Sequence, residues 1–173
     1  MITDNCKVRL RAVEPTDLDF LFSLETCDGA AENGFATAPV SRQMLWEYIQ
    51  NYTADIFAAR QLRLVIEDIA TGEAVGAIDI ADFEPRDRRG FVGIAVQPDC
   101  RRQGFALAAL QLLCDYASST LGMHQLAAVV AADNEASRHL FAAAGFKPAG
   151  RLRSWVRRGR QYADALIFQR LFC

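Results

Sequence analysis

Residues 91–117 constrain the fold more than any other part of this 173-residue chain. They begin with FVGIAV, a short run of apolar, branched and aromatic residues, and from Ala106 onward apolar residues recur at helical spacing. Between the two lies RRQGFA, which puts two arginines and a glycine at the expected start of the helix. Free backbone N–H groups and the helix dipole favour an anion there, so the stretch predicts a strand, a phosphate-binding turn and a helix.

The rest of the chain alternates between strand-like and helix-like patterns, with no internal repeat. A glycine-punctuated loop at 27–39 separates two predicted helices and is expected to select the substrate, and a charged loop is predicted at 83–89. These patterns predict one α/β (α+β) domain over residues 1–173, with a mixed, mostly antiparallel sheet flanked by helices. Strands are predicted at 7–13, 62–69, 74–80, 91–96, 125–132, 152–156 and 162–172, and helices at 18–24, from Ser41 to Tyr52, from Ala106 to Ala117 and from Asn134 to Ala144.

Composition narrows the class of protein. There is no basic-then-apolar leader at residues 1–10 and no apolar run near eighteen residues, which predicts a cytoplasmic protein that does not enter a membrane. The five cysteines are scattered and odd in number, so neither a disulfide framework nor a zinc site is expected. With two histidines in the whole chain, no metal is predicted.

The net charge of −2 is distributed unevenly. Residues 1–60 hold five Lys or Arg against nine Asp or Glu, a balance of −4, and residues 151–173 hold six Arg against one Asp, a balance of +5. Both ends can be solvated surface. Alternatively, the acidic part attracts a cationic substrate and the basic tail attracts phosphate or an acidic partner. No basic patch is interleaved with aromatic residues, so nucleic acid binding is not predicted.

Two ordered motifs point to a family. The RRQGFA segment lacks the Lys-Ser/Thr ending of a P-loop, and it resembles the Arg/Gln-x-x-Gly-x-Gly/Ala pyrophosphate loop of the GCN5-related N-acetyltransferase (GNAT) superfamily. Residues 133–146, DNEASRHLFAAAGF, resemble its Asn-x-x-Ser-x-x-Leu-Tyr-x-x-x-Gly-Phe signature. The resemblance extends over nearly the whole chain and is closest to the bacterial spermidine and ribosomal-protein acetyltransferase branches.

The resemblance implies an enzyme that uses acetyl-CoA. In the family fold, the strand ending at Val96 and the strand at 125–132 run parallel and splay apart, and the pantetheine arm lies in the opening. Asn134 could alternatively be a helix cap, and Gly104 an ordinary turn glycine. The residues expected to bind the cofactor are Ile94, Ala95, Val96, Arg101, Arg102, Gln103, Gly104, Phe105, Ala106, Asn134, Ser137 and Phe141.

The catalytic residues depart from the family pattern. Phe141 replaces the tyrosine that usually protonates the leaving thiol, and Ser137, on the same helical face, is the candidate substitute unless it is only a surface serine. Phe91 occupies a position where many relatives carry a glutamate base. Asp79 and Asp82 are the nearest replacements, and their spacing on a regular strand lets at most one face the cleft. The alternative for both is a solvated strand edge.

The acceptor is expected to be a primary amine attacking the thioester directly. The polyamine branch carries adjacent acidic residues after a phenylalanine, whereas Phe35 here is followed by Ala36, Thr37 and Ala38. The alternatives are therefore a polyamine or other small amine, the amino terminus of a protein, or a CoA-binding module without catalysis. A homo-oligomer is left open. The residues expected to bind the acceptor are Glu25, Asp28, Glu32, Phe35, Asp79 and Asp82.

Overall fold

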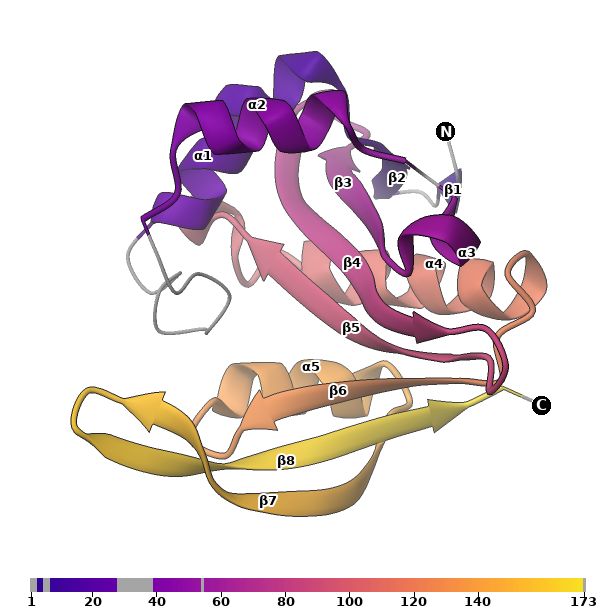
Figure 1. Ribbon diagram of the computed structural model, residues 1–173, viewed down its shortest axis with the longest axis vertical. Helices are drawn as coiled ribbons and strands as arrows, with labels where there is room; N and C mark the ends of the chain where they lie inside the picture. Colours follow the sequence, from indigo (N-terminus) through magenta and orange to yellow (C-terminus); the bar gives the residue numbers. More distant parts are fainter. Residues whose placement is uncertain (1–2, 5–6, 28–38, 54, 173) are drawn as a thin grey trace.

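The computed structural model describes residues 3–4, 7–27, 39–53 and 55–172, and within them eight strands form one sheet in the order β1-β2-β3-β4-β5-β6-β8-β7 (Figure 1). Every neighbouring pair is antiparallel except β5 and β6, which are parallel. This confirms the mixed, mostly antiparallel sheet. The strands are β1 (Thr3–Asp4), β2 (Val8–Ala12), β3 (Leu62–Asp68), β4 (Ala74–Glu84), β5 (Arg89–Val96), β6 (Gln125–Ala131), β7 (Lys147–Arg158) and β8 (Gln161–Leu171).

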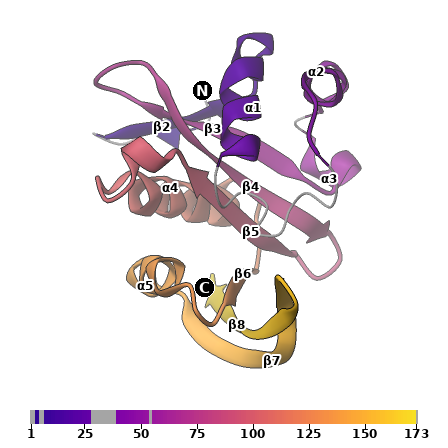
Figure 2. The same cartoon turned by 90° about the vertical axis from the view of Figure 1, so that its left-hand side faces the viewer.

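Helices cover both faces of the sheet. The elements α1 and α2 lie on one face and α4 lies on the other, with α5 beside β6 on the α4 side (Figure 2). No described helix is long and apolar enough to cross a bilayer. The helices are α1 (Leu18–Thr26), α2 (Arg42–Gln50), α3 (Ile56–Ala59), α4 (Phe105–Ser119) and α5 (Glu135–Ala143).

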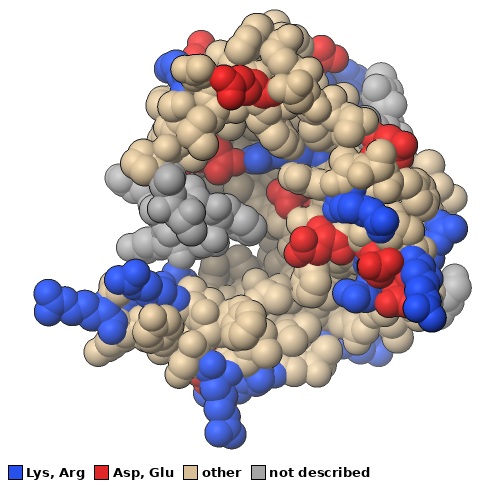
Figure 3. Space-filling model, viewed as in Figure 1, with Lys and Arg blue, Asp and Glu red and all other residues tan. Residues whose placement is uncertain are grey.

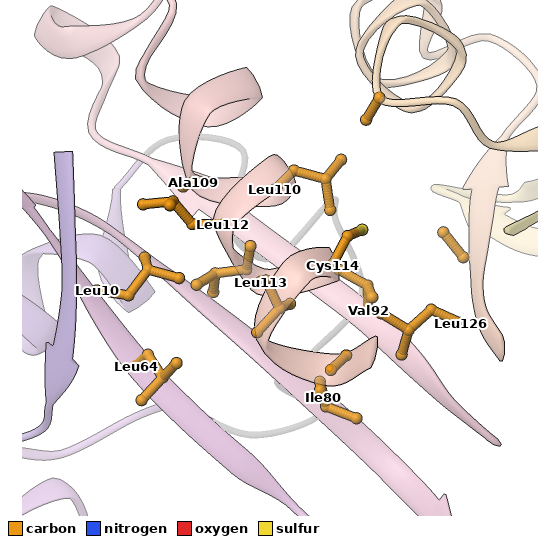
Figure 4. Packing of buried hydrophobic residues seen from close by; sticks show 14 of the residues in the cluster. Leu10, Leu64, Ile80, Val92, Ala109, Leu110, Leu112, Leu113, Cys114 and Leu126 are labelled. Atoms are coloured by element: carbon orange, nitrogen blue, oxygen red, sulfur yellow. The ribbon is translucent and has the colours of Figure 1, made fainter. Parts of the chain in front are cut away.

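The larger of two cores lies between α4 and the sheet. Leu64, Ile80 and Val92 from three strands meet Leu110 and Leu113 of α4 (Figure 4). The smaller core lies under α1 and α2 and includes Val65 and Ala77. Because side chains alternate along a strand, Arg63 on β3 and Asp79 on β4 lie on the same face as these two residues, under α1 and α2.

The parallel strands β5 and β6 pair over only three positions. These are Arg89 with Gln125, Gly90 with Leu126 and Phe91 with Ala127. From Val92 to Val96, β5 pairs with β4 alone, so the two parallel strands diverge (Figure 1). The space-filling view shows a hollow between the part of the molecule built on β2–β5 and the part built on β6–β8, with charged side chains along its wall (Figure 3). The predicted splay is thus present.

The predicted charged loop at 83–89 is wrong in extent. β4 continues to Glu84 and β5 begins at Arg89, which leaves a turn at 85–88. The strand continues because Phe83 is only 2 % exposed and packs edge-on against Phe57, with ring centroids 5.2 Å apart. Likewise β7 begins at Lys147, five residues before the prediction, while β1 and α3 were not predicted.

Candidate active site

The predicted phosphate loop forms a turn that ends at the start of α4. A 3-10 turn at Pro98–Cys100 leads into it, and Gly104 is the N-cap residue of α4 with a φ of +83°. Glycine adopts this left-handed conformation without steric cost. Two side-chain bonds to the backbone hold the loop: Arg101 Nε donates to the Val96 carbonyl at 3.0 Å, and Gln103 Nε2 donates to the Asp99 carbonyl at 3.0 Å.

The loop surrounds the helix start with positive charge. No side chain caps α4, so its first N–H groups remain available to an anion. Arg101, Arg102, Gln103 and Gly104 are exposed. Lys7, which the sequence did not single out, adds a further cation: its Nζ is 3.7 Å from where a Cβ on Gly104 would be and 5.0 Å from the centroid of the Phe105 ring. An uncapped helix with three cations beside it fits a pyrophosphate.

Three predicted cofactor residues lie on or beside α5. Asn134 caps the helix, with its Oδ1 accepting a hydrogen bond from the Ser137 N–H at 3.0 Å. The Ser137 side chain is half-buried. Phe141 is only 4 % exposed and packs in the core against Phe146 and Phe168, at centroid distances of 5.2 Å and 6.3 Å. The helix-cap alternative for Asn134 is therefore observed, and contact of the three residues with the cofactor stays a prediction.

The strand residues predicted to face the cofactor lie beyond the last β5–β6 pair. Ile94 and Val96 are half-buried and Ala95 is exposed. On α4, Phe105 is 6 % exposed and packs in the large core, and Ala106 is half-buried. The free side of β5 at the divergence therefore offers backbone groups to a ligand between the two strands.

Asp79 lies beside the point where β5 and β6 diverge. It pairs across the sheet with Arg63 on β3 and with Gly93 on β5, which lies two residues past the last β5–β6 pair. A Cβ on Gly93 would be 2.6 Å from Asp79 Oδ2, so the glycine makes room for the carboxylate. The half-buried Asp79 makes no hydrogen bond or ion pair with any described residue. Burial raises its pKa, an effect that Arg63 opposes and Glu25 reinforces.

Arg63 lies between the two carboxylates. Its Nη2 forms an ion pair with Glu25 of α1, with both side chains about four-fifths buried. Its backbone is held by Tyr52, whose hydroxyl donates to the Arg63 carbonyl and accepts from the Arg63 N–H, both at 2.8 Å. A single charged residue at an alternating strand position carries no functional signal, so sequence reasoning missed Arg63 and Gly93.

The other predicted acceptor residues lie elsewhere. Asp82 is exposed at a bulge of β4 and has a φ of 49°, so of the two predicted aspartates only Asp79 lies half-buried beside Gly93. Asp28, Glu32 and Phe35 fall outside the described residues. The described acidic residues of the first helix are paired, Asp19 with Arg42 and Glu25 with Arg63. The described residues contain no cluster of three metal-binding side chains.

Known proteins with the same sequence pattern are acetyltransferases. Residues 7–147 match the family model described as "Acetyltransferase (GNAT) domain". The chain is 28% identical over 155 residues to the uncharacterised N-acetyltransferase YoaA of Bacillus subtilis, covering 90% of this chain and 88% of that protein. It is 27% identical over 148 residues to spermidine N(1)-acetyltransferase of Vibrio cholerae, covering 86% and 83%.

Solved structures share the fold over almost the full chain. The Vibrio cholerae spermidine N-acetyltransferase in complex with CoA and spermine superposes with a TM-score of 0.86 at 25% identity, covering 96% of each chain. A probable acetyltransferase superposes with a TM-score of 0.85 at 21% identity and shows the fold alone. With a family model that spans most of its length, a phosphate loop at the start of α4 and diverging parallel strands, this chain belongs to the GNAT family of acetyl-CoA-dependent N-acetyltransferases.

Proposed function

We propose that the enzyme transfers the acetyl group of acetyl-CoA to a primary amine that attacks the thioester directly, with Asp79 binding the ammonium group and accepting its proton. The main support is that Asp79 is a half-buried carboxylate without a hydrogen-bond or ion-pair partner among the described residues, at the point where β5 and β6 diverge. Small amines such as polyamines are the first acceptor class, because the Vibrio cholerae relative is named a spermidine acetyltransferase.

The chemistry requires a base more than an acid. An alkyl amine has a pKa near ~10.4 and is almost fully protonated at neutral pH. A carboxylate whose pKa is raised by burial is a better proton acceptor than an exposed one. When bound, acetyl-CoA supplies the thioester carbonyl and a leaving thiol with a pKa near ~8.5, which needs only moderate help from an acid. Ser137, half-buried on α5, is the proposed donor of that proton.

Two of the five cysteines are poorly suited to transfer through a thiol, which favours direct attack. Cys114 is fully buried, and burial raises its pKa to about 11. Burial also raises the pKa of Cys100. A nucleophilic cysteine requires a lowered pKa, so neither residue fits that role.

We further propose a homo-oligomer, because a solved structure of the Vibrio cholerae enzyme is described as dodecameric.

Asp79→Asn tests the proposal. Loss of a general base costs roughly 10²–10⁴-fold in rate, so kcat/KM for the best amine should fall by about that factor while acetyl-CoA affinity, measured by calorimetry, is kept. In the wild type, kcat/KM should fall at acidic pH with an apparent pKa above the ordinary range for an aspartate, because burial raises the pKa of Asp79. Asp82→Asn is the matched variant, on the same strand but exposed, and should change kcat/KM by about threefold or less. Full activity in Asp79→Asn would remove the proposal.

The same variant has a stability readout. Since the folded-state pKa of Asp79 is raised, the native protein binds this proton more tightly than the unfolded chain, and stability falls as pH rises from the unfolded pKa through the folded one. Above that window the ionised, buried carboxylate costs stability. Asp79→Asn should therefore raise Tm at pH 7 and lose this pH dependence, which differential scanning calorimetry at pH 4 and pH 7 can check.

A further inference from the structure

Arg63, Glu25 and Asp79 form a charged group that we call the Arg63 cluster. Arg63 and Asp79 are direct neighbours across β3 and β4, where facing side chains are about 4.5–5.5 Å apart at Cβ, and Glu25 reaches Arg63 from α1. The Arg63 side chain is 17% exposed and that of Glu25 is 20% exposed. Charges buried to this degree destabilise a fold unless they are compensated, so the number of positive and negative groups in the cluster matters.

The Arg63 cluster has one more negative charge than positive charge. It holds two carboxylates and one guanidinium, and the guanidinium cannot lose its proton in a protein. Glu25 takes the ion pair with Arg63, and Asp79 has no ion-pair partner in the part of the chain that the structure describes. One cation therefore completes the charge balance of the cluster. In an enzyme that acetylates amines, this cation is the ammonium group of the acceptor.

We propose that Arg63 determines acceptor specificity by holding the charge of this cluster at −1, so that the buried acceptor site receives one ammonium group and rejects a second. The inference rests on the proposed function and goes beyond it in naming the substrate class. The preferred acceptor is an amine whose reacting nitrogen is the only cation buried beside Asp79, with the rest of the molecule neutral or outside the cluster.

Hydrogen bonding alone does not explain why residue 63 is an arginine. The Tyr52 hydroxyl fixes its backbone through two bonds of 2.8 Å. Yet the buried Arg63 Nε has no hydrogen-bond partner in the described part of the chain. An unsatisfied buried donor is costly, and a smaller apolar residue would avoid that cost but would leave Glu25 without its ion-pair partner. A role in charge balance accounts for an arginine at this position.

A series of variants that changes the charge of the cluster stepwise provides the test. Arg63→Met removes the one positive charge and brings the cluster to −2. Glu25→Gln removes one carboxylate and brings it to 0, which leaves Arg63 free to pair with Asp79. The double variant returns the cluster to −1. The measurement is thiol release from acetyl-CoA with butylamine, which has one ammonium group, and with 1,4-diaminobutane, which has two. Arg63→Met should raise the ratio of kcat/KM for diamine over monoamine about tenfold. Glu25→Gln should lower both values about tenfold, and the double variant should restore the wild-type ratio within about twofold.

Arg9→Met is the matched control. Arg9 also forms a partly buried ion pair with a glutamate, Glu67, and its Nε is likewise buried without a partner, but it lies on β2, away from Asp79. If Arg63 has a purely structural role, the ratio of kcat/KM for diamine over monoamine should be the same in Arg63→Met as in Arg9→Met. Thermal unfolding of every variant identifies those that do not fold. If Arg63→Met does not fold, unchanged activity in a folded Glu25→Gln protein overturns the inference.

The outcomes separate this inference from the proposed function. If the wild-type enzyme binds acetyl-CoA and releases no thiol with either amine or with a wider amine panel, the proposed function itself fails. If the wild type acetylates amines and the diamine-to-monoamine ratio in a folded Arg63→Met protein equals that in Arg9→Met, Arg63 has no role in specificity and only this inference is lost.

Discussion

The cofactor end and the acceptor end of the site are built in opposite ways. At the cofactor end, the consecutive residues from Arg101 to Gly104 form an exposed, positively charged loop that leads directly into α4. At the acceptor end, Glu25, Arg63 and Asp79 come from a helix and two strands and are mostly buried. The first end depends on local backbone conformation and the second on charge balance within packed structure. Substitutions should therefore affect cofactor binding and acceptor choice separately.

Gly104→Glu should have the largest effect of these substitutions, and this effect should be confined to cofactor binding. The substitution puts bulk and negative charge beside Lys7, where the pyrophosphate is expected, in a conformation that disfavours side chains by about 1–2 kcal/mol. Acetyl-CoA binding should fall below detection by calorimetry in a folded protein.

The matched control is Gly122→Glu, which imposes the same backbone strain past the other end of α4, about 22 Å away by the helical rise. It should lose comparable stability and keep acetyl-CoA affinity. If Gly104→Glu binds acetyl-CoA normally, the loop is not the pyrophosphate site and the comparison between the two ends collapses.

Phe141→Tyr tests whether the reaction needs an acid that protonates the leaving thiolate. If the thiolate leaves largely unaided, turnover should change by roughly tenfold or less, which is about 1.4 kcal/mol of barrier. Because Phe141 is buried, the new hydroxyl enters the core. Unless it finds a hydrogen-bond partner, it should cost about 1–3 kcal/mol of stability and lower Tm accordingly. A thousandfold gain in kcat would instead show that the missing acid limits the reaction and that Ser137 does not replace it.

Salt should have the smallest effect on the acceptor end, measured at saturating acetyl-CoA so that screening of the exposed cofactor loop does not contribute. The Debye length shrinks from about 10 Å at 0.1 M to about 3 Å at 1 M, so kcat/KM for a cationic amine should fall a few-fold while that for a neutral aromatic amine stays level. Because Glu25 is already paired with Arg63, neutralising Asp28 and Glu32 together is the sharper variant. Full salt sensitivity in that variant would mean that the acidic amino-terminal part is only solvated surface.

The structure of the cofactor end can be predicted from the sequence to a greater extent than that of the acceptor end. The strand before Val96, the turn with Gly104 and the helix after it follow from periodicity within residues 91–117, because each depends on near neighbours. The arrangement of Arg63, Asp79 and Gly93 depends on the registers of β3, β4 and β5, which no local pattern fixes. The bulge that leaves Asp82 exposed, and the position of Lys7 beside Gly104, likewise arise only when distant segments pack together.

The three-position contact between β5 and β6 has a mechanical consequence. The sheet consists of two leaves joined at one end by the pairs from Arg89 to Phe91 and backed by α4 and α5. Beyond Phe91 no ladder pair joins β5 to β6, so separating the leaves there breaks no ladder hydrogen bond, and the displacement grows with distance from the joint. We therefore expect opening to cost least toward Val96, where the distance between the two strands should vary most, and to change the spacing at the joint least.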